Sequence, residues 1–333
     1  MEIFPTQYST LSSAALNIKL GESYSLSDTT CRLLVRNVSD TYILESATGK
    51  YIFKIYRDAH RKQEEIRGEV ELLTVLFEKG ASVSRPIPDK SGEILQVFNA
   101  AEGTRYGVLF TWAEGKPVYT MTDSQLETVG REMAILHDIS SSIQLSYQRK
   151  AYSVETVIIR PLEVVEPAFA GLEEEYDYLK HTAKEVINQY QNFFSGFNYG
   201  YCHFDFLPKN FHFDDNDVIT FFDFDFAGEG FLAYDITSFF IHFFLEFTTG
   251  KITAEEARRA FGVFVDSYRK VRRLSDEEIS AIPYLGFGFW VFYLGFQYEN
   301  FDDWSNLFFG PKFLKERTAL IKKWMDTAHV LLP

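Results

Sequence analysis

The chain of 333 residues lacks most features of a secreted or nucleic-acid-binding protein. It has two cysteines, Cys31 and Cys202, too few for a disulfide framework and not spaced with histidines as a zinc site requires. Basic residues are scarce, 33 against 47 acidic ones, and the formal net charge of −14 argues against a nucleic-acid partner. The N-terminus shows no basic region followed by an apolar segment, so we expect no secretory signal and a cytoplasmic location.

Long uncharged stretches are also rare, and a single one, residues 279–298, is about long enough to cross a bilayer. Pro283 and several glycines interrupt this stretch, and its flanks are acidic rather than basic. It can be a membrane span or a buried helix, and these features favour the buried helix. We therefore expect no membrane partner. Internal repeats and low-complexity tracts are missing too, and a chain of this length is expected to divide into two lobes.

The most informative motif is H-F-D-F-L-P-K-N at residues 203–210, followed by F-D-F-D at residues 222–225. Asn210 follows Asp205 by five positions, and Asp223 follows Asn210 by 13. A carboxylate at Asp205 can orient a substrate hydroxyl and accept its proton, while an amide oxygen and a second carboxylate hold Mg²⁺ against the phosphates of ATP. The spacing therefore predicts the phosphoryl-transfer site of a kinase, with Asp205 as the base and the other two as metal ligands.

The residues around this motif predict its local structure. Pro208 prevents a helix in the loop, and residues 218–222 are expected to form a buried strand that ends at Asp223. The acidic cluster at residues 214–217 is expected to be a hairpin turn rather than a metal site, because Asp and Asn satisfy turn backbone groups locally. Asp225 would lie on the same side as Asp223 if the segment stays extended, and whether it assists Asp223 in metal binding does not follow from the sequence.

At these residues the chain resembles the aminoglycoside phosphotransferase family, which also includes choline kinases and type II homoserine kinases. The resemblance extends from about residue 33 to about residue 235 and includes G-R-E-M-A-I-L-H at residues 130–137. It implies that Asp235, in Y-D-I at residues 234–236, holds the catalytic loop in shape with its carboxylate. It also implies that His203 is a structural member of that loop.

The resemblance implies an α+β, two-lobed protein-kinase-like fold, with an N-terminal antiparallel sheet plus a helix and a mainly helical C-terminal lobe. We expect a nucleotide-binding lobe at residues 1–111, with residues 1–25 as an N-terminal extension, and a catalytic and substrate-binding lobe at residues 112–333. The sequence pattern predicts strands at 31–35, 42–45 and 51–56, and helices at 61–78, 235–247, 254–272, near 290 and at 314–331.

Lys54 lies in the middle of an apolar strand that precedes a glutamate-rich helix. Such a lysine can be an edge residue that points to water, but its position favours binding to the phosphates of the nucleotide. Glu69 aligns with the glutamate that the resemblance places on this helix as the ion-pair partner of the lysine. Glu64, Glu65 and Glu71 are alternatives on the same helix.

A glycine-rich phosphate loop is missing, because the first turn reads R-N-V-S-D at residues 36–40. Ser39 is the candidate nucleotide contact in this turn, although an ordinary polar hairpin explains the same residues equally well. Residues 112–117, where Gly and Pro mark a break, are expected to form the hinge, and backbone groups of Thr111 to Ala113 are expected to bind the purine of ATP. Trp112 between them can be a hinge residue or a core residue.

The acceptor is the least defined part of the expected site. Glu299, Asp302 and Asp303 lie among aromatic residues, and this combination can bind an ammonium group. A solvated helix end explains the same acidic residues. We therefore expect a small-molecule substrate with a hydroxyl group, and an amine-bearing molecule is the more specific alternative.

Two other functions share this motif. Protein kinases carry a lysine directed to the transferred phosphate two positions after the base, and this chain has Leu207 there. Lys209 is nearby, but its direction does not follow from the sequence. A nucleotide-binding pseudokinase is the other alternative, although the four residues that would show degeneration, Lys54, Asp205, Asn210 and Asp223, are all present. The sequence thus favours an ATP- and Mg²⁺-dependent kinase of a small polar metabolite or antibiotic.

Overall fold

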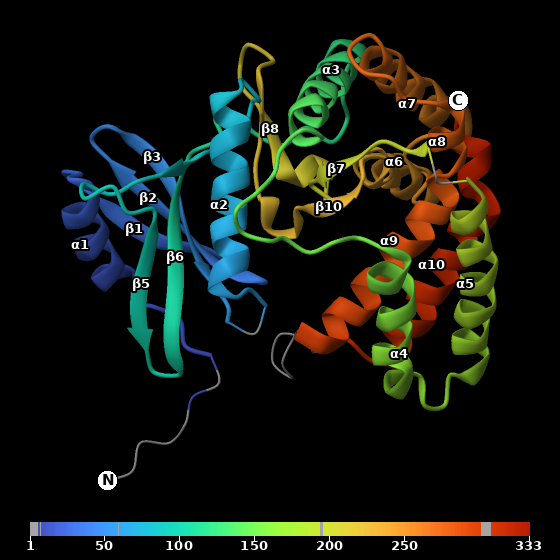
Figure 1. Ribbon diagram of the computed structural model, residues 1–333, viewed down its shortest axis with the longest axis horizontal. Coiled ribbons are helices and arrows are strands. Elements are labelled where there is room, and N and C mark those ends of the chain that lie inside the picture. Colours follow the sequence, from blue (N-terminus) through green and yellow to red (C-terminus); the bar gives the residue numbers. More distant parts are fainter. Residues whose placement is uncertain (1–5, 7, 59, 194–195, 301–307) are drawn as a thin grey trace. The chain divides into compact units, whose positions relative to one another are not determined.

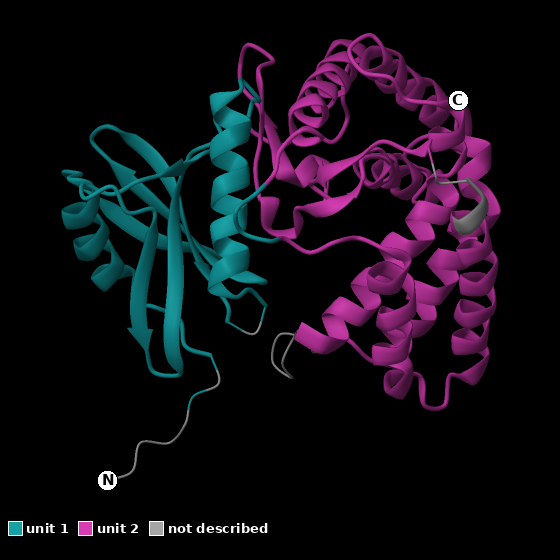
Figure 2. Cartoon of the chain, in the orientation of Figure 1, with its two compact units in different colours: residues 1–114, 145–148 teal, residues 115–144, 149–333 magenta. Residues whose placement is uncertain are grey.

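A computed structural model describes residues 6, 8–58, 60–193, 196–300 and 308–333 (Figure 1). Contacts divide the chain into two compact units (Figure 2). Unit 1 comprises residues 1–114 and 145–148, and unit 2 comprises residues 115–144 and 149–333. The expected α+β class is confirmed, with an antiparallel sheet in unit 1 and a mainly helical unit 2.

Unit 1 is built on an antiparallel sheet in the order β1-β2-β3-β6-β4, with β5 paired to β6. Two helices accompany this sheet. The predicted N-terminal strands are confirmed, and the helix predicted at 61–78 begins two residues later. The elements are α1 (Ser13–Tyr24), β1 (Thr30–Arg36), β2 (Ser39–Ser46), β3 (Gly49–Tyr56), α2 (Gln63–Glu78), β4 (Pro86–Ile87), β5 (Leu95–Ala100) and β6 (Gly103–Thr111).

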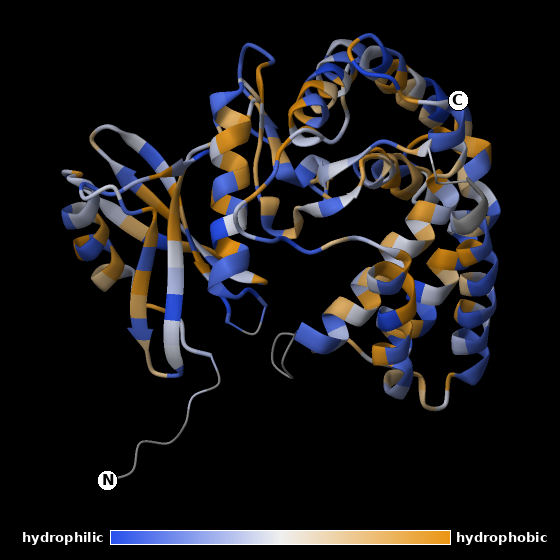
Figure 3. Cartoon of the chain, in the orientation of Figure 1, coloured by the Kyte–Doolittle hydropathy of each residue, from blue (hydrophilic) through white to orange (hydrophobic). Residues whose placement is uncertain are grey.

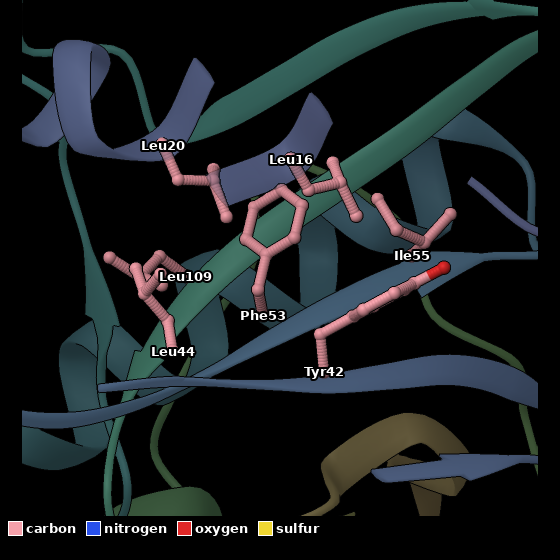
Figure 4. Packing of buried hydrophobic residues seen from close by; sticks show 7 residues of the cluster. All are labelled: Leu16, Leu20, Tyr42, Leu44, Phe53, Ile55 and Leu109. Carbon is pink, nitrogen blue, oxygen red and sulfur yellow. The ribbon is translucent and has the colours of Figure 1, made fainter. Parts of the chain in front are cut away.

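The core of unit 1 lies between the sheet and α1. Phe53 and Ile55 of β3 are buried and pack with Leu16 and Leu20 of α1 (Figure 4). Successive side chains of a strand point to opposite faces, so Lys54 between them points to the other face of the sheet. The alternation of this strand therefore separates an apolar face from the face that carries the lysine.

Unit 2 combines helices with two short antiparallel ladders, β7–β10 and β8–β9. Its helices are α3 (Asp123–Ser140), α4 (Arg160–Val165), α5 (Glu173–Phe193), α6 (Ala233–Thr248), α7 (Ala254–Arg269), α8 (Asp276–Ser280), α9 (Ile282–Asn300) and α10 (Pro311–Thr327). Its strands are β7 (Tyr199–Cys202), β8 (Phe211–Phe213), β9 (Ile219–Phe221) and β10 (Gly228–Phe231). The two ladders flank the loop that carries the motif.

The long uncharged segment forms α9, whose apolar residues are coloured orange and white in Figure 3. Most of its side chains are buried among the helices of unit 2, so the expected buried helix is confirmed. Gly286 allows close packing here, because a Cβ atom at this position would lie 2.1 Å from the ring of Trp324. Within the described ranges, no helix combines the length and apolarity needed to cross a membrane.

Candidate active site

The motif at residues 203–210 forms a loop that leaves β7 and ends in a single 3₁₀ turn, Pro208–Asn210. Asp205 and Asn210 are both buried. The amide nitrogen of Asn210 donates to the main-chain oxygen of Asp205 at 2.8 Å and to its Oδ2 at 3.0 Å. The ammonium of Lys209 lies 2.8 Å from the same Oδ2. Two donors thus hold one oxygen of the Asp205 carboxylate, and Oδ1 is the other oxygen.

Asp235 connects this loop to the first turn of α6. Its carboxylate accepts hydrogen bonds from the main-chain N–H groups of His203, at 2.8 Å, and Phe204, at 2.7 Å. Nε2 of His137 on α3 lies 3.0 Å from Oδ2 of the same carboxylate. The side chain of His203 reaches the main-chain oxygen of Phe222 at 3.0 Å. A buried acid on one helix therefore orders the backbone directly before Asp205.

Phe204 shows why the loop needs this support. Its φ of 69° lies in the left-handed region, which is unfavourable for a bulky residue. Its ring is buried and stacks on Tyr152 with a centroid distance of 3.8 Å. Backbone strain of this kind persists only where surrounding interactions impose it, and it is frequent at functional sites.

Asp223 follows β9 and begins a second irregular segment. Its φ of 63° is also left-handed, and a 3₁₀ turn, Phe224–Phe226, follows it. Asp223 is exposed, whereas Asp225 is buried. The segment is not extended here, so the condition under which Asp225 would share a side with Asp223 is not met. The main-chain N–H of Phe222 donates to the main-chain oxygen of Asn210 at 3.0 Å and thus links this segment to the motif loop.

Sequence reasoning did not identify Arg149, which orders the segment after Asp223. Its buried guanidinium donates to the main-chain oxygens of Phe224 at 3.1 Å, Asp225 at 2.6 Å and Ala227 at 2.8 Å. These residues lie more than 70 positions further along the chain, so no local pattern in the sequence indicates the contact. Arg149 thus supports the segment that carries Asp223, as Asp235 supports the segment that carries Asp205.

Tyr293 of α9 is a second residue near the motif that the sequence did not indicate. Burial, and then the charge of Asp205, raise the pKa of its phenol well above the usual value. The phenol therefore stays protonated. A neutral, protonated group beside Asp205 adds no further negative charge to this part of the site.

The acidic cluster between β8 and β9 is a turn, as predicted. Oδ1 of Asp214 accepts hydrogen bonds from the main-chain N–H groups of Asn216 and Val218, both at 2.8 Å. Asp217 adopts the left-handed conformation with φ 58°. The carboxylate of Asp214 is therefore used by the turn itself.

In unit 1, Lys54 of β3 faces Glu69 of α2. The ammonium lies 3.7 Å from Oε1 of Glu69, and both side chains are buried. The alternative glutamates of the same helix have other positions. Glu65 lies 3.7 Å from Arg61, Glu71 accepts hydrogen bonds from main-chain N–H groups of the 145–148 segment, and Glu64 is exposed. Of the four, Glu69 is therefore the one that the structure pairs with Lys54.

The other expected nucleotide contacts of unit 1 lie at strand ends. Ser39 is the first residue of β2, buried and paired with Tyr56, so the turn after β1 is narrower than the predicted residues 36–40. Thr111 ends β6, and both of its main-chain groups are hydrogen-bonded to neighbours, the N–H to Arg85 and the oxygen to the hydroxyl of Ser84. Ala113 is buried.

The expected acceptor residues are only partly within the described chain. Glu299 lies near the end of α9, where its carboxylate pairs with Arg160 of α4. Both line a cavity of about 310 Å³ in unit 2, together with Lys150, Tyr152 and Phe296. The charge of Glu299 is thus partly balanced by a neighbouring cation. Asp302 and Asp303 lie outside the described residues.

Three comparisons relate the chain to known proteins. The profile of the phosphotransferase enzyme family matches residues 30–274. A homoserine kinase of Xanthobacter autotrophicus is 25% identical over 81% of this chain and 78% of its own length. A microcompartment-associated aminopropanol kinase has a similar fold, with a TM-score of 0.73, 19% identity and coverage of 95% of this chain and 99% of that chain. An amicoumacin kinase in complex with AMP-PNP and Ca²⁺ has a TM-score of 0.72, 20% identity and coverage of 97% and 96%.

Proposed function

Because the chain belongs to the phosphotransferase enzyme family, we propose that it transfers the γ-phosphate of ATP to a hydroxyl group of a small molecule. The observation that carries this proposal is the arrangement of the Asp205 carboxylate. Its Oδ2 accepts from Asn210 and Lys209, so Oδ1 is the oxygen for a substrate hydroxyl. A buried carboxylate on a fixed loop is suited to orient that hydroxyl and to accept its proton.

The step is a direct displacement. The hydroxyl oxygen of the acceptor forms a bond to the γ-phosphorus, and the bond from this phosphorus to the bridging oxygen of ATP breaks. The electron pair of that bond stays on the bridging oxygen, and ADP leaves. The hydroxyl proton passes to Oδ1 of Asp205.

Asn210 and Asp223 suit a Mg²⁺ site. Mg²⁺ prefers oxygen ligands and is held in kinases by one or two protein groups together with the phosphates. The amide nitrogen of Asn210 is turned to Asp205, so its oxygen is the end available to a cation. The bound ion would neutralise the phosphates during transfer.

Unit 1 would contribute to binding the nucleotide. In this proposal the Lys54 ammonium, oriented by Glu69, binds the phosphates of ATP. Ser39 and Ala113 remain the proposed contacts of the nucleotide in this unit. For Thr111 the proposal is limited to the methyl group and to donation by the hydroxyl, because both main-chain groups have partners and Oγ1 accepts from the main-chain N–H of Arg85.

A small hydroxylated amine is the acceptor class that we propose. The names of the homoserine kinase and the aminopropanol kinase specify substrates that carry both an amine and a hydroxyl. Glu299 at the cavity in unit 2 offers a carboxylate to an ammonium group, and Arg160 beside it offers a cation to a carboxylate. This pair suits an amine acceptor, with or without a carboxylate of its own.

The test is a screen of purified protein for ATP consumption with hydroxylated amines, hydroxy amino acids, sugars and aminoglycoside antibiotics, with Asp205→Asn as the blank. We expect ADP release with at least one amine acceptor and none with the variant. Phosphorylation of an unstructured peptide without any small-molecule turnover would instead establish a protein kinase. Nucleotide binding without turnover of any acceptor would establish a pseudokinase.

A further inference from the structure

Lys209 has a position that the motif alone did not predict. The 3₁₀ turn that begins at Pro208 brings its side chain back to Asp205, four positions earlier, with the ammonium 2.8 Å from Oδ2. The side chain of Lys209 is 53% exposed, whereas that of Asp205 is 6% exposed. The ammonium is therefore held at the proposed base, although about half of the lysine side chain is accessible to solvent.

We propose that Lys209 is a catalytic residue whose ammonium contacts the transferred phosphoryl group while Asp205 accepts the proton. This inference rests on the proposed function. Because Lys209 and Asn210 both contact Oδ2, an acceptor hydroxyl would bind Oδ1, at about 2.7 Å. The two oxygens belong to one carboxylate, so the phosphorus that this hydroxyl attacks would lie within reach of the lysine side chain.

The charges around Asp205 also require a cation here. Asp205 and Asp223 are both negative, and the phosphoryl group brings further negative charge to the same place. The ammonium of Lys209, 2.8 Å from Oδ2 of Asp205, brings a positive charge to this place. A fixed cation at this point stabilises charge that develops during transfer more than it stabilises the bound substrate.

Lys209 thus takes the role for which protein kinases use a lysine two positions after the base. This chain has Leu207 at that position, and the side chain that contacts the base comes from two positions further on. The loop reaches the same chemistry through a different residue, because the 3₁₀ turn Pro208–Asn210 brings the side chain of Lys209 to Asp205.

The test is Lys209→Met, measured with aminopropanol and homoserine as acceptors and with basal ATP hydrolysis as the reference without acceptor. We expect kcat to fall about ten- to a hundredfold, while KM for ATP and for the acceptor changes by less than about threefold. Lys209→Arg keeps the charge, so the loss in log kcat should be at most half of the loss in Lys209→Met. Lys251→Met is the matched control, because Lys251 is also exposed, at 65%, and lies 2.8 Å from a buried carboxylate, Glu246.

A second measurement separates this role from a structural one. ADP, Mg²⁺, aluminium fluoride and the acceptor together mimic the transferred phosphoryl group. Lys209→Met should weaken binding of this mixture by about the same factor as kcat, and leave the affinity for ADP and Mg²⁺ unchanged. Wild-type kcat in Lys209→Met, or a raised acceptor KM at unchanged kcat, would overturn the inference. If Asp205→Asn is inactive while Lys209→Met is fully active, only the role of Lys209 fails, whereas full activity of both variants refutes the proposed function itself.

Discussion

In unit 1 the ion pair of the proposed site lies on regular secondary structure, whereas in unit 2 the motif residues Asp205, Asn210 and Asp223 lie on irregular backbone. Lys54 occupies the middle of a paired strand and meets Glu69 from a regular helix. Asp205 instead follows Phe204, which has left-handed backbone, and Asp223 is itself left-handed. The first arrangement follows from strand and helix periodicity. The second depends on side chains that bond to backbone groups far away in the sequence.

This difference has an energetic consequence. A strand residue is held by the whole ladder of backbone hydrogen bonds around it, so the loss of one side chain leaves the backbone in place. The backbone of each of the two irregular segments of unit 2 makes at least two hydrogen bonds to one charged side chain, Asp235 for the first and Arg149 for the second. Substitutions at such supports are expected to change the shape of the site as well as its charge.

The largest effect on activity is expected from Asp205→Asn in unit 2. The substitution keeps the size of the side chain but removes the oxygen that accepts the hydroxyl proton, so kcat should fall about 10³-fold or more. The affinity for ATP should stay nearly unchanged, because the base acts on the transition state. The exposed turn residue Asp215, changed to Asn, is the control and should keep full activity. Retention of most of the turnover in Asp205→Asn would exclude this residue as the base.

The next largest effect is expected from Asp235→Asn and concerns stability. The two main-chain donors from His203 and Phe204 reach different oxygens of the carboxylate, and an amide provides only one acceptor. One buried N–H group would lose its partner, and His137 would lose a charged one. We expect the free energy of unfolding to fall by about 3 kcal/mol, measured by urea denaturation.

Asp223→Asn is the matched control for Asp235→Asn, because Asp223 is exposed and should cost less than about 0.5 kcal/mol of unfolding free energy. A loss in Asp235→Asn as small as that expected of the control would mean that the irregular loop does not depend on Asp235. The contrast drawn between the two units would then be wrong.

A smaller effect is expected for the proposed metal ligands. Asp223→Ala should weaken Mg-ATP binding about ten- to a hundredfold, because it removes a carboxylate from the ion that anchors the phosphates. Asn210→Ala should weaken it less. Calorimetry with ATP, with Mg²⁺ and with EDTA, is the measurement, and the difference from wild type should vanish without the metal. A variant that binds Mg-ATP as wild type does would remove Asp223 from the metal shell.

The contrast between regular structure in unit 1 and irregular backbone in unit 2 also decides how much of the site could be predicted from the sequence. The strands around Lys54 follow from alternation and the helix that carries Glu69 follows from its apolar pattern, although the choice of Glu69 among the glutamates of this helix came from the resemblance. The Asp214 turn follows from its composition. By contrast, the role of His203 and Asp235 came only from the resemblance to a family, because hydrogen bonds across about 30 positions leave no local pattern.

Arg149, Tyr293 and the direction of Lys209 were not predicted at all. Each depends on how a turn directs one side chain or on contacts between distant segments, and neither follows from hydrophobic periodicity. Ser39 is expected in a turn because R-N-V-S-D reads as one, yet β2 begins at Ser39, three residues before the predicted strand at 42–45. Thr111 is expected to contact the purine, but its main-chain groups bond to Ser84 and Arg85, and no local pattern in the sequence indicates these distant partners.

The smallest effect, and the sharpest test of the regular site in unit 1, is expected from the Lys54–Glu69 pair. Lys54→Met should raise KM for ATP about tenfold, and Glu69→Gln should raise it less, because the lysine keeps its charge but loses its orientation. Each single variant leaves a buried charge with less compensation, whereas Lys54→Met with Glu69→Gln removes both charges.

The double variant should therefore lose about 1–2 kcal/mol less unfolding free energy than the two single variants lose together, as measured by a double-mutant cycle. Lys50→Met with Glu45→Gln is the matched control, since this pair lies on the neighbouring ends of β2 and β3 at 3.1 Å and is exposed. Its coupling should stay below about 0.5 kcal/mol. A coupling energy of Lys54 with Glu69 as small as that expected of the exposed pair would mean that burial does not strengthen the interaction. The strands of unit 1 would then hold Lys54 in place without help from Glu69.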